Sequence, residues 1–281
     1  MTTDGADAHK AVEEAARAAR GTVADLAGVP GERLDQALRA IADGLVRGSA
    51  PVLAANEADM TAAREAGLGP GLLDRLRMDE GRLAAIADQL RALAGVPYES
   101  AERAVRELPD GLVLTERRRP VGVIGANFEA RPNVVVDIAS QFVKSRNAGV
   151  LRTGSAAIRS AITLADEVIA PALASAGLDP AMIQLVRVPG QSSARALVSQ
   201  PGLIPLVILR GSGDSTRSLA AEAARISDLD PAPGPQAIRA CLVGARLPEQ
   251  QADAAAIALR SGATLDADII VSATGLVLKV F

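Results

Sequence analysis

Apolar residues recur at helical spacing through the first third of the chain. Residues 8–93 are rich in Ala, Leu, Arg and Glu, and this composition favours helix. Within this stretch an apolar stripe predicts one buried helix face, and its members are Leu34, Leu38, Ile41 and Leu45. We expect the Arg and Glu residues that alternate along these helices to lie on solvated faces.

Polar residues and glycines mark where these helices begin and end. Ser49, followed by Pro51, resembles an N-terminal cap with proline in the first helical turn. The glycine-rich segment 67–71 interrupts the helical pattern, and Asp79 is placed to cap the helix that follows. The pattern therefore predicts a helical region over residues 8–95.

Beyond residue 112 the pattern changes, because short β-branched runs now alternate with helical segments. An exposed strand is predicted over 112–116, and further strands are predicted over 121–125, 149–151, 183–188 and 204–209. The helical segments between them cover 134–143, 156–176 and 192–199. Strands that alternate with helices of this length form βαβ units with a parallel sheet. The sequence therefore predicts an α/β fold, with its βαβ units over residues 119–228.

Composition narrows the chemistry that this chain can perform. Its 281 residues are 49% hydrophobic and 22% charged, which is typical of a globular protein with a sizeable core. A single Cys and a single His exclude an internal disulfide and a Cys/His zinc site, so we expect no metal. His9 lies in a polar N-terminal segment, which argues against a Ser-His-Asp triad. The chemistry must rest on carboxylates, Arg and Lys, backbone amides or one thiol.

Charge, aromatic content and hydropathy patterning restrict the partners. No Trp, one Tyr and three Phe are too few for the stacking platforms that bind single-stranded nucleic acid, and a net charge of −3 disfavours binding to a phosphate backbone. The first ten residues are polar, unlike a secretory signal, and no apolar run is long enough to span a membrane. We expect a cytoplasmic protein with a small-molecule ligand, no nucleic-acid partner and no membrane partner.

Three segments that follow predicted strands carry usable chemistry. Ligands of parallel α/β sheets bind beyond the carboxyl ends of the strands, and the segments at these positions are 126–133, 152–155 and 210–214. Each brings cations or small residues to the start of a helix, where free amides favour an anion. None contains a standard dinucleotide or P-loop motif. Ordinary βα turns and a site for a nucleotide or phosphorylated ligand therefore both remain open.

Several stretches resemble one known family. The most characteristic is Glu129-Ala-Arg-Pro-Asn133, and the similar stretches are 119–137, 144–155, 209–213 and, in the helical region, 56–60 and 69–76. They resemble γ-glutamyl phosphate reductase, the glutamate-5-semialdehyde dehydrogenase of proline biosynthesis, which is a member of the aldehyde dehydrogenase superfamily. The resemblance covers roughly residues 10 to 250.

The resemblance implies a fold and a domain organisation. It implies N-terminal helices followed by a Rossmann-like parallel sheet of the aldehyde dehydrogenase type, with residues 1–230 as the cofactor-binding domain. Members of the family continue much further, so residues 231–281 correspond to a truncated remnant of an incomplete catalytic domain. The strand over 112–116 would then lack its usual partner. That strand or the apolar tail 269–281 is expected to pair within the chain or in a homo-oligomer.

The resemblance also implies an oxidoreductase activity. Family members use NADPH to reduce the acyl phosphate γ-glutamyl phosphate to glutamate-5-semialdehyde through a cysteine thioester. Cys241 lies at the spacing of their nucleophile, and Asn133 matches the side-chain amide that is suited to an oxyanion hole. Glu129 and Arg131, beside it, are expected to bind the anionic substrate. Asn133 has a second interpretation, as the cap of the helix that follows.

The same resemblance assigns NADP-binding residues. The adenosine ribose is expected at the strand end formed by Arg152, Thr153, Gly154 and Ser155. Arg152 is suited to pair with a 2′-phosphate, which favours NADP over NAD.

The pyrophosphate is expected at the loop formed by Arg210, Gly211, Ser212 and Gly213. Thr153, Ser212 and Arg146 stand where the family usually has glycine. Because glycine permits close approach of a ligand to the backbone, these side chains could restrict the site.

The surroundings of Cys241 depart from the family pattern. Leu242 follows it where the family has histidine, and no glycine lies directly before it. A small buried cysteine in a strand is therefore a competing interpretation. Two alternatives to the active reductase stay open. One is a catalytically impaired, nucleotide-binding pseudo-enzyme or partner subunit, and the other is a relative that acts on a different acyl phosphate.

Overall fold

The structure is a computed structural model that describes most of the chain. Backbone is described for residues 3–100, 102–107, 113–117, 119–211, 213–229, 241–242, 259–260 and 266–267. Side chains are described over residues 5–100, 119–211 and 213–225. The apolar tail 269–281 and Ser212 lie outside these ranges.

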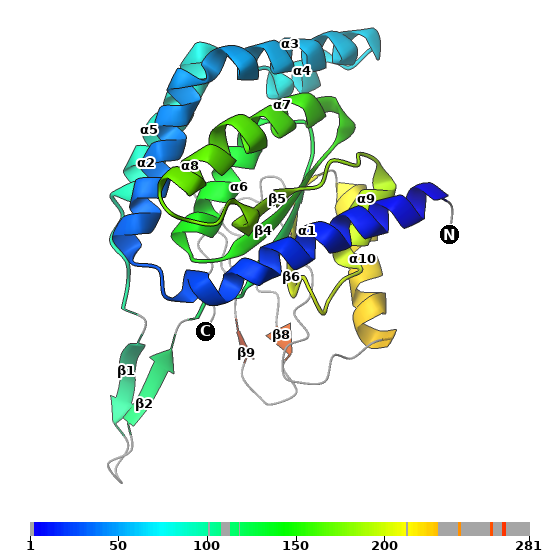
Figure 1. Cartoon of the computed structure of the whole chain (residues 1–281). Coiled ribbons are helices and arrows are strands. Elements are labelled where there is room, and N and C mark those ends of the chain that lie inside the picture. Colours follow the sequence, from blue (N-terminus) through cyan, green and yellow to red (C-terminus); the bar gives the residue numbers. More distant parts are fainter. Residues whose placement is uncertain are drawn as a thin grey trace, which may run out of the picture.

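A parallel sheet forms the centre of the molecule (Figure 1). Its strand order is β5-β4-β3-β6-β7, and every neighbouring pair is parallel. The strands are β3 (Val123–Phe128), β4 (Ala148–Thr153), β5 (Ile183–Leu185), β6 (Leu206–Leu209) and β7 (Cys241–Leu242). Because strands in a parallel sheet require crossover connections, the helical segments between them are placed on its two faces. The predicted α/β fold with a parallel sheet is confirmed.

Helices cover both faces of this sheet. On one face lie α1 (Thr3–Ala27), α9 (Gln191–Val198) and α10 (Gly213–Leu229). On the other lie α6 (Asn133–Lys144) and one continuous helical run made of α7 (Ile158–Thr163), a π-helical turn η2 (Leu164–Ile169) and α8 (Ala170–Ser175). Short 3-10 turns η1 (Ser155–Ala157) and η3 (Pro180–Met182) flank this run. No helix among the described residues has the length and apolar character needed to cross a bilayer.

The remaining N-terminal helices form an outer layer. They are α2 (Gly31–Arg47), α3 (Ser49–Glu65), α4 (Pro70–Leu76) and α5 (Glu80–Ala94). In this layer α2 and α5 pack on α6, α2 also packs on α8, and α3 packs on α7. The apolar stripe predicted from residue 34 to residue 45 is fully buried in α2. The Asp79 side chain caps α5 as predicted, because its carboxylate accepts a hydrogen bond of 2.8 Å from the backbone N–H of Arg82. For α3 the cap is Gly48 and no side chain contributes, so the capping role predicted for Ser49 is wrong.

A two-stranded antiparallel hairpin extends from the body of the molecule (Figure 1). It consists of β1 (Glu102–Glu107) and β2 (Val113–Arg117). The strand predicted over 112–116 is confirmed as β2, but its partner is β1, which the sequence pattern did not predict. The sequence of β1 does not predict a strand, because it is highly charged and charged residues are depleted in strands generally.

Two strand boundaries differ from the prediction in a way that affects the site. The central strand β3 runs to Phe128, three residues beyond the predicted end at Gly125, and β4 runs to Thr153. Asn127 and Arg152 therefore lie inside the sheet and not in the loops that follow it. Both side chains are buried, and they bond to each other. The two side chains of such a pair satisfy each other's hydrogen-bonding groups across neighbouring strands. A single sequence does not reveal which residues pair in this way.

Candidate functional site

The carboxyl ends of β3, β4 and β6 meet at one edge of the sheet. Phe128 pairs with Thr153, and Asn127 pairs with Leu209. Beyond the last pairs, the Gly154 N–H donates to the Phe128 carbonyl over 3.2 Å, and the Arg210 N–H donates to the Asn127 carbonyl over 2.8 Å. The loops that begin at residues 129, 154 and 210 are thus tied to the same edge.

Glu129 connects these three loops. A Cβ placed on Gly211 would lie 3.1 Å from the Glu129 carboxyl carbon, and one on Gly154 would lie 3.9 Å from the Glu129 Cα. The structure therefore brings together the predicted substrate segment and both predicted cofactor segments. Ala130, which follows Glu129, has a φ of 46°, so the chain turns sharply there before α6 begins.

Asn133 is the first residue of α6 and does not cap it. The cap position is Pro132, and no side chain completes the cap, so the capping interpretation of Asn133 is wrong. Instead the Asn133 Nδ2 donates to Asp137 Oδ2, one helical turn later, over 3.1 Å. Burial raises the pKa of Asp137 to about 6, while the charge of Arg210 and the Asn133 hydrogen bond partly oppose that rise.

Guanidinium groups gather around this turn. Arg131 is half-buried, and burial lowers its pKa, as do the nearby positive charges of Arg210 and then of Arg75 on α4. Arg210 is exposed at the end of β6. The lowered pKa of Arg131 reflects a region of positive potential, which attracts an anionic ligand.

Arg152 lies in the interior, with only 4% of its surface exposed. Its Nη1 donates to Asn127 Oδ1 over 3.0 Å, its Nε donates to Ser193 Oγ over 3.2 Å, and its Nη2 donates to the Gly190 carbonyl. Burial lowers the pKa of Arg152, and the charge of Glu129 partly restores it. The guanidinium thus joins β4 to β3 and to the start of α9.

The other predicted cofactor residues differ in their environments. Thr153 is 1% exposed, and within the described residues its hydroxyl has no hydrogen-bond partner. Ser155 is exposed at the start of η1, and Gly213 is exposed as the first residue of α10. Arg146 lies between α6 and β4, at the opposite ends of the strands, and its φ of 58° is one that glycine favours. It therefore does not restrict this edge.

Cys241 is described only through its backbone. It begins β7 and pairs with Ile208, while Leu242 pairs with Leu209 at the end of β6. The residue expected to be the nucleophile thus lies within a strand, one position before the carboxyl edge of the sheet. This placement agrees with the competing interpretation of Cys241 as a cysteine within a strand. Its role as the catalytic nucleophile stays a prediction.

Sequence reasoning missed several residues that organise the edge. Asp137 holds Asn133, while Asn127 and Ser193 receive Arg152. Asn127 and Asp137 lie within the resembling stretch 119–137 and are polar residues among apolar neighbours, a pattern that signals a bonded partner without naming it. The described residues contain no group of three or more His, Cys, Asp or Glu side chains that could hold a metal ion.

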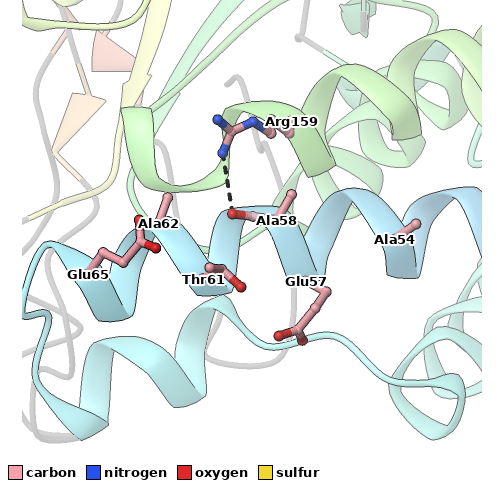
Figure 2. Close-up of a pocket in the computed structure, with 7 residues that line it drawn as sticks. All are labelled: Ala54, Glu57, Ala58, Thr61, Ala62, Glu65 and Arg159. Atoms are coloured by element: carbon pink, nitrogen blue, oxygen red, sulfur yellow. Dashed lines mark hydrogen bonds between the residues drawn. The ribbon is translucent and has the colours of Figure 1, made fainter.

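A surface groove of about 490 Å³ lies apart from this edge, along α3 (Figure 2). Its lining residues are all exposed and are Ala54, Glu57, Ala58, Thr61, Ala62, Glu65 and Arg159. Arg159 reaches across from α7 and donates to the Ala58 carbonyl over 3.3 Å (Figure 2). Two of its charged residues are in ion pairs, Glu57 with Arg64 and Arg159 with Asp59, and its other side chains are mostly small, so it offers no reactive arrangement.

Comparison with known proteins identifies relatives by sequence. No protein-family model matches the chain. The γ-glutamyl phosphate reductase of Clavibacter michiganensis is 43% identical over 213 residues, which are 75% of this chain and 49% of that protein. The enzyme of the same name from Chloroflexus aggregans is 42% identical over 201 residues, 71% of this chain and 47% of that protein. The chain spans about half the length of the curated relatives it matches.

Solved structures give the same result for the fold. γ-Glutamyl phosphate reductase from Thermotoga maritima matches with a TM-score of 0.73 and 23% identity, over 83% of this chain and 53% of that one. The Saccharomyces cerevisiae protein of that name has a TM-score of 0.68 and 27% identity, over 75% of this chain and 54% of that one. An NAD-dependent aldehyde dehydrogenase from Sinorhizobium meliloti, 18% identical, has a TM-score of 0.65 over 83% of this chain and 42% of that one. By sequence the chain is homologous to γ-glutamyl phosphate reductases over 75% of its length, and its fold is that of the aldehyde dehydrogenases.

Proposed function

We propose that this chain binds NADPH at the carboxyl edge of β3, β4 and β6. We further propose that it acts in the reduction of γ-glutamyl phosphate to glutamate-5-semialdehyde, the proline-biosynthesis step that its relatives' name denotes. The observation that carries the proposal is the convergence of three loops at one edge, with Arg131 and Arg210 beside them. A dinucleotide and an acyl phosphate are both anionic, so both require such a positive region.

The residues present at this edge fit a dinucleotide. The buried Thr153 hydroxyl lacks a partner among the described residues, so a ligand hydroxyl or phosphate oxygen would satisfy it. We assign Gly154 and Ser155 to the ribose, and the loop of Arg210, Gly211, Ser212 and Gly213 to the pyrophosphate. NADPH, when bound, supplies the hydride. NADP in preference to NAD and a cytoplasmic location belong to the same proposal.

Substrate binding would fall to the residues before and at the start of α6. Arg131 would attract the phosphate, and Glu129 would fix the loop against Gly211. The Asn133 amide carries two N–H donors, of which one bonds to Asp137. The other is suited to the oxyanion that develops when the acyl carbon is attacked.

Cys241 is the proposed nucleophile. Its thiolate would form a bond to the acyl carbon, the bond from that carbon to the phosphate oxygen would break, and inorganic phosphate would leave with the electron pair. A thioester would remain on the enzyme. Its reduction would release the aldehyde and return the thiolate.

The reaction is tested most directly in reverse. Glutamate-5-semialdehyde, phosphate and NADP⁺ should yield NADPH, measured by absorbance, and the Cys241→Ala variant should yield none. Equal rates for the two forms would exclude the thioester mechanism. Cys241-dependent turnover of another acyl phosphate, without this reverse activity, would instead identify a relative with a different substrate.

A second candidate is a nucleotide-binding protein without turnover, acting as a pseudo-enzyme or a partner subunit. The observation that favours it is the position of Cys241 within β7, beside Ile208 and before the carboxyl edge. This candidate predicts that NADPH binds and raises the melting temperature equally in the full chain and in its Cys241→Ala variant. At a hundredfold excess over Kd the binding would add about 2.7 kcal/mol of stability. Reverse turnover that depends on Cys241 would exclude it.

A further inference from the structure

Arg152 occupies an unusual position for a residue expected to contact a ligand. Its three hydrogen bonds go to three different parts of the chain, namely the Asn127 side chain on β3, the Ser193 side chain on α9 and the backbone carbonyl of Gly190. Arg152 as a whole is 4% exposed. Pairing with a phosphate uses two parallel N–H donors of one guanidinium edge, and here the donors are divided among protein acceptors.

The turn that receives Arg152 depends on this contact. Gly190 has a φ of 104° and immediately precedes α9. Its carbonyl accepts from Arg152 and also from Ser193 Oγ, at 2.9 Å. The Val186 N–H, at the start of the β5–α9 connection, donates to the Leu151 carbonyl on β4 over 2.8 Å. At the other end of the connection Gly190 is exposed, and the bond from Arg152 ties its carbonyl to the end of β4.

The charge of Arg152 is also balanced within the protein. The Glu129 carboxylate stabilises the charged guanidinium, and Glu129 belongs to the loop that contacts Gly211 and Gly154. Removing Arg152 would therefore release the Gly190 turn and remove the buried charge with which Glu129 interacts. Both effects alter the shape of the edge for any nucleotide.

We propose that Arg152 is a positioning residue, which holds the Gly190 turn and the end of β3 in place for the nucleotide and does not itself select the 2′-phosphate. This inference rests on the proposed binding of a nicotinamide dinucleotide at this edge. It replaces the pairing with a 2′-phosphate that the sequence alone suggested. Its consequence is that NADPH and NADH depend on Arg152 to the same extent.

The test compares both nucleotides on the full-length chain. Kd values for NADPH and for NADH are measured by calorimetry for the unchanged protein and for Arg152→Gln, Arg152→Lys and Ser193→Ala. We expect Arg152→Gln to weaken both nucleotides by a similar factor of about ten or more. Arg152→Lys keeps the positive charge but cannot make the three separate hydrogen bonds of the guanidinium. It should therefore weaken the binding of both nucleotides nearly as much. Ser193→Ala removes one acceptor and should weaken both to a smaller, equal extent.

A control variant and a nucleotide-free measurement complete the design. Arg17→Gln removes an exposed arginine that pairs with Glu13 on α1, and it should change neither affinity. In Arg152→Gln without nucleotide, amide hydrogens of residues 186–193 should exchange about tenfold faster than in the unchanged protein.

Two outcomes would overturn the inference. One is a loss confined to NADPH, with NADH unaffected, and the other is unchanged exchange at residues 186–193. Failure of the unchanged protein to bind either nucleotide would overturn the proposed cofactor instead, and the exchange measurement would still decide whether Arg152 fixes the turn.

Discussion

Among single residues, Asp137 has the most unusual environment at the site. It lies half-buried on α6, with the Asn133 amide on one oxygen and the charge of Arg210 nearby. Burial dominates these influences and raises its pKa to about 6, from an ordinary value of 3.8. A carboxylate that prefers its protonated form in the folded state weakens folding when it is ionised.

Asp137→Asn should therefore stabilise the protein above neutral pH. The ionised carboxylate costs about 3 kcal/mol above pH 6, and this cost fades as the pH falls from about 6 towards 3.8. Urea unfolding at a series of pH values should show the variant more stable at pH 8 and the two proteins equal near pH 4. Asp88→Asn, at an exposed position, should show no such gain. A difference that widens as the pH falls would contradict the assignment.

Gly149 illustrates a different constraint on a single residue. It lies in β4, where a Cβ would come within 2.2 Å of the Phe142 ring on α6. Phe142 is itself 1% exposed, so the ring has nowhere to move. The absent side chain is what lets α6 pack directly on the sheet.

Gly149→Ala should cost about 3 kcal/mol, because overpacking a closed core forces the backbone apart. Chemical denaturation measures the loss, and the double variant with Phe142→Leu should lose less than the sum of the two single variants. Gly21→Ala serves as the control. Gly21 lies in α1 with nothing within 4 Å of a new Cβ, so that change should add up to about 1 kcal/mol.

At the scale of elements, a buried polar network fixes where α7 begins. Asp59 on α3 accepts from the N–H of Ser160 over 2.8 Å and from its hydroxyl over 2.7 Å. Asn56 donates to that same hydroxyl and to the Leu76 carbonyl, and its Oδ1 accepts from the Met78 N–H. Asn56 and Asp59 lie in the resembling stretch 56–60, and the structure gives both a structural role.

Asp59→Ala should destabilise the protein by about 2–4 kcal/mol, because it leaves the buried donors of Ser160 without an acceptor. Urea unfolding gives the magnitude, and hydrogen exchange should localise the loosening to residues 155–163. Glu57→Ala removes an exposed carboxylate of the same helix and should change stability by less than about 0.5 kcal/mol. Equal effects of the two changes would exclude the network.

Periodicity predicted most of these elements but not their ends. The helices and the parallel strands follow from apolar spacing, and Asp79 capped α5 as its position indicated. The end of β3 was missed because Asn127 is polar, and only its partner Arg152 makes a polar residue acceptable inside a sheet. The sequence located the three loops of the site. It did not predict the burial of Arg152 between them, because that burial depends on the same pairing with Asn127.

At the scale of the whole molecule, one partly buried polar cluster joins the helical layer to the sheet layer. Asp35 on α2 accepts from Lys144 Nζ at the end of α6 over 2.7 Å, and from the Tyr98 hydroxyl over 2.9 Å. Lys144 also lies 4.0 Å from the centre of the Tyr98 ring and donates to the Val96 carbonyl. The segment containing Val96 and Tyr98 leads to the β1–β2 hairpin, so the cluster fixes the base of that hairpin.

Asp35→Ala should cost about 3–5 kcal/mol, because it leaves the ammonium of Lys144 buried without a counter-charge. Replacing both partners, in Asp35→Ala with Lys144→Met, should recover part of that loss. Thermal and urea unfolding of both variants test this relation. A double variant less stable than the single one would show that the ion pair is not the source of the effect.

The position of α1 has a consequence for how the chain reaches its fold. This helix is synthesised before the elements that cover it, because it packs on β4, β5 and α9, and the His9 carbonyl accepts from Gln200, 191 residues later. At about 5–20 residues per second, α1 waits roughly ten to forty seconds for the surface that covers Val12, Ala16 and Ala19. During that time its apolar face must stay exposed to solvent or contact another apolar surface temporarily. Among the described elements, α1 is therefore one whose apolar face stays uncovered for a long part of synthesis, so we expect it to be a site where chaperones bind.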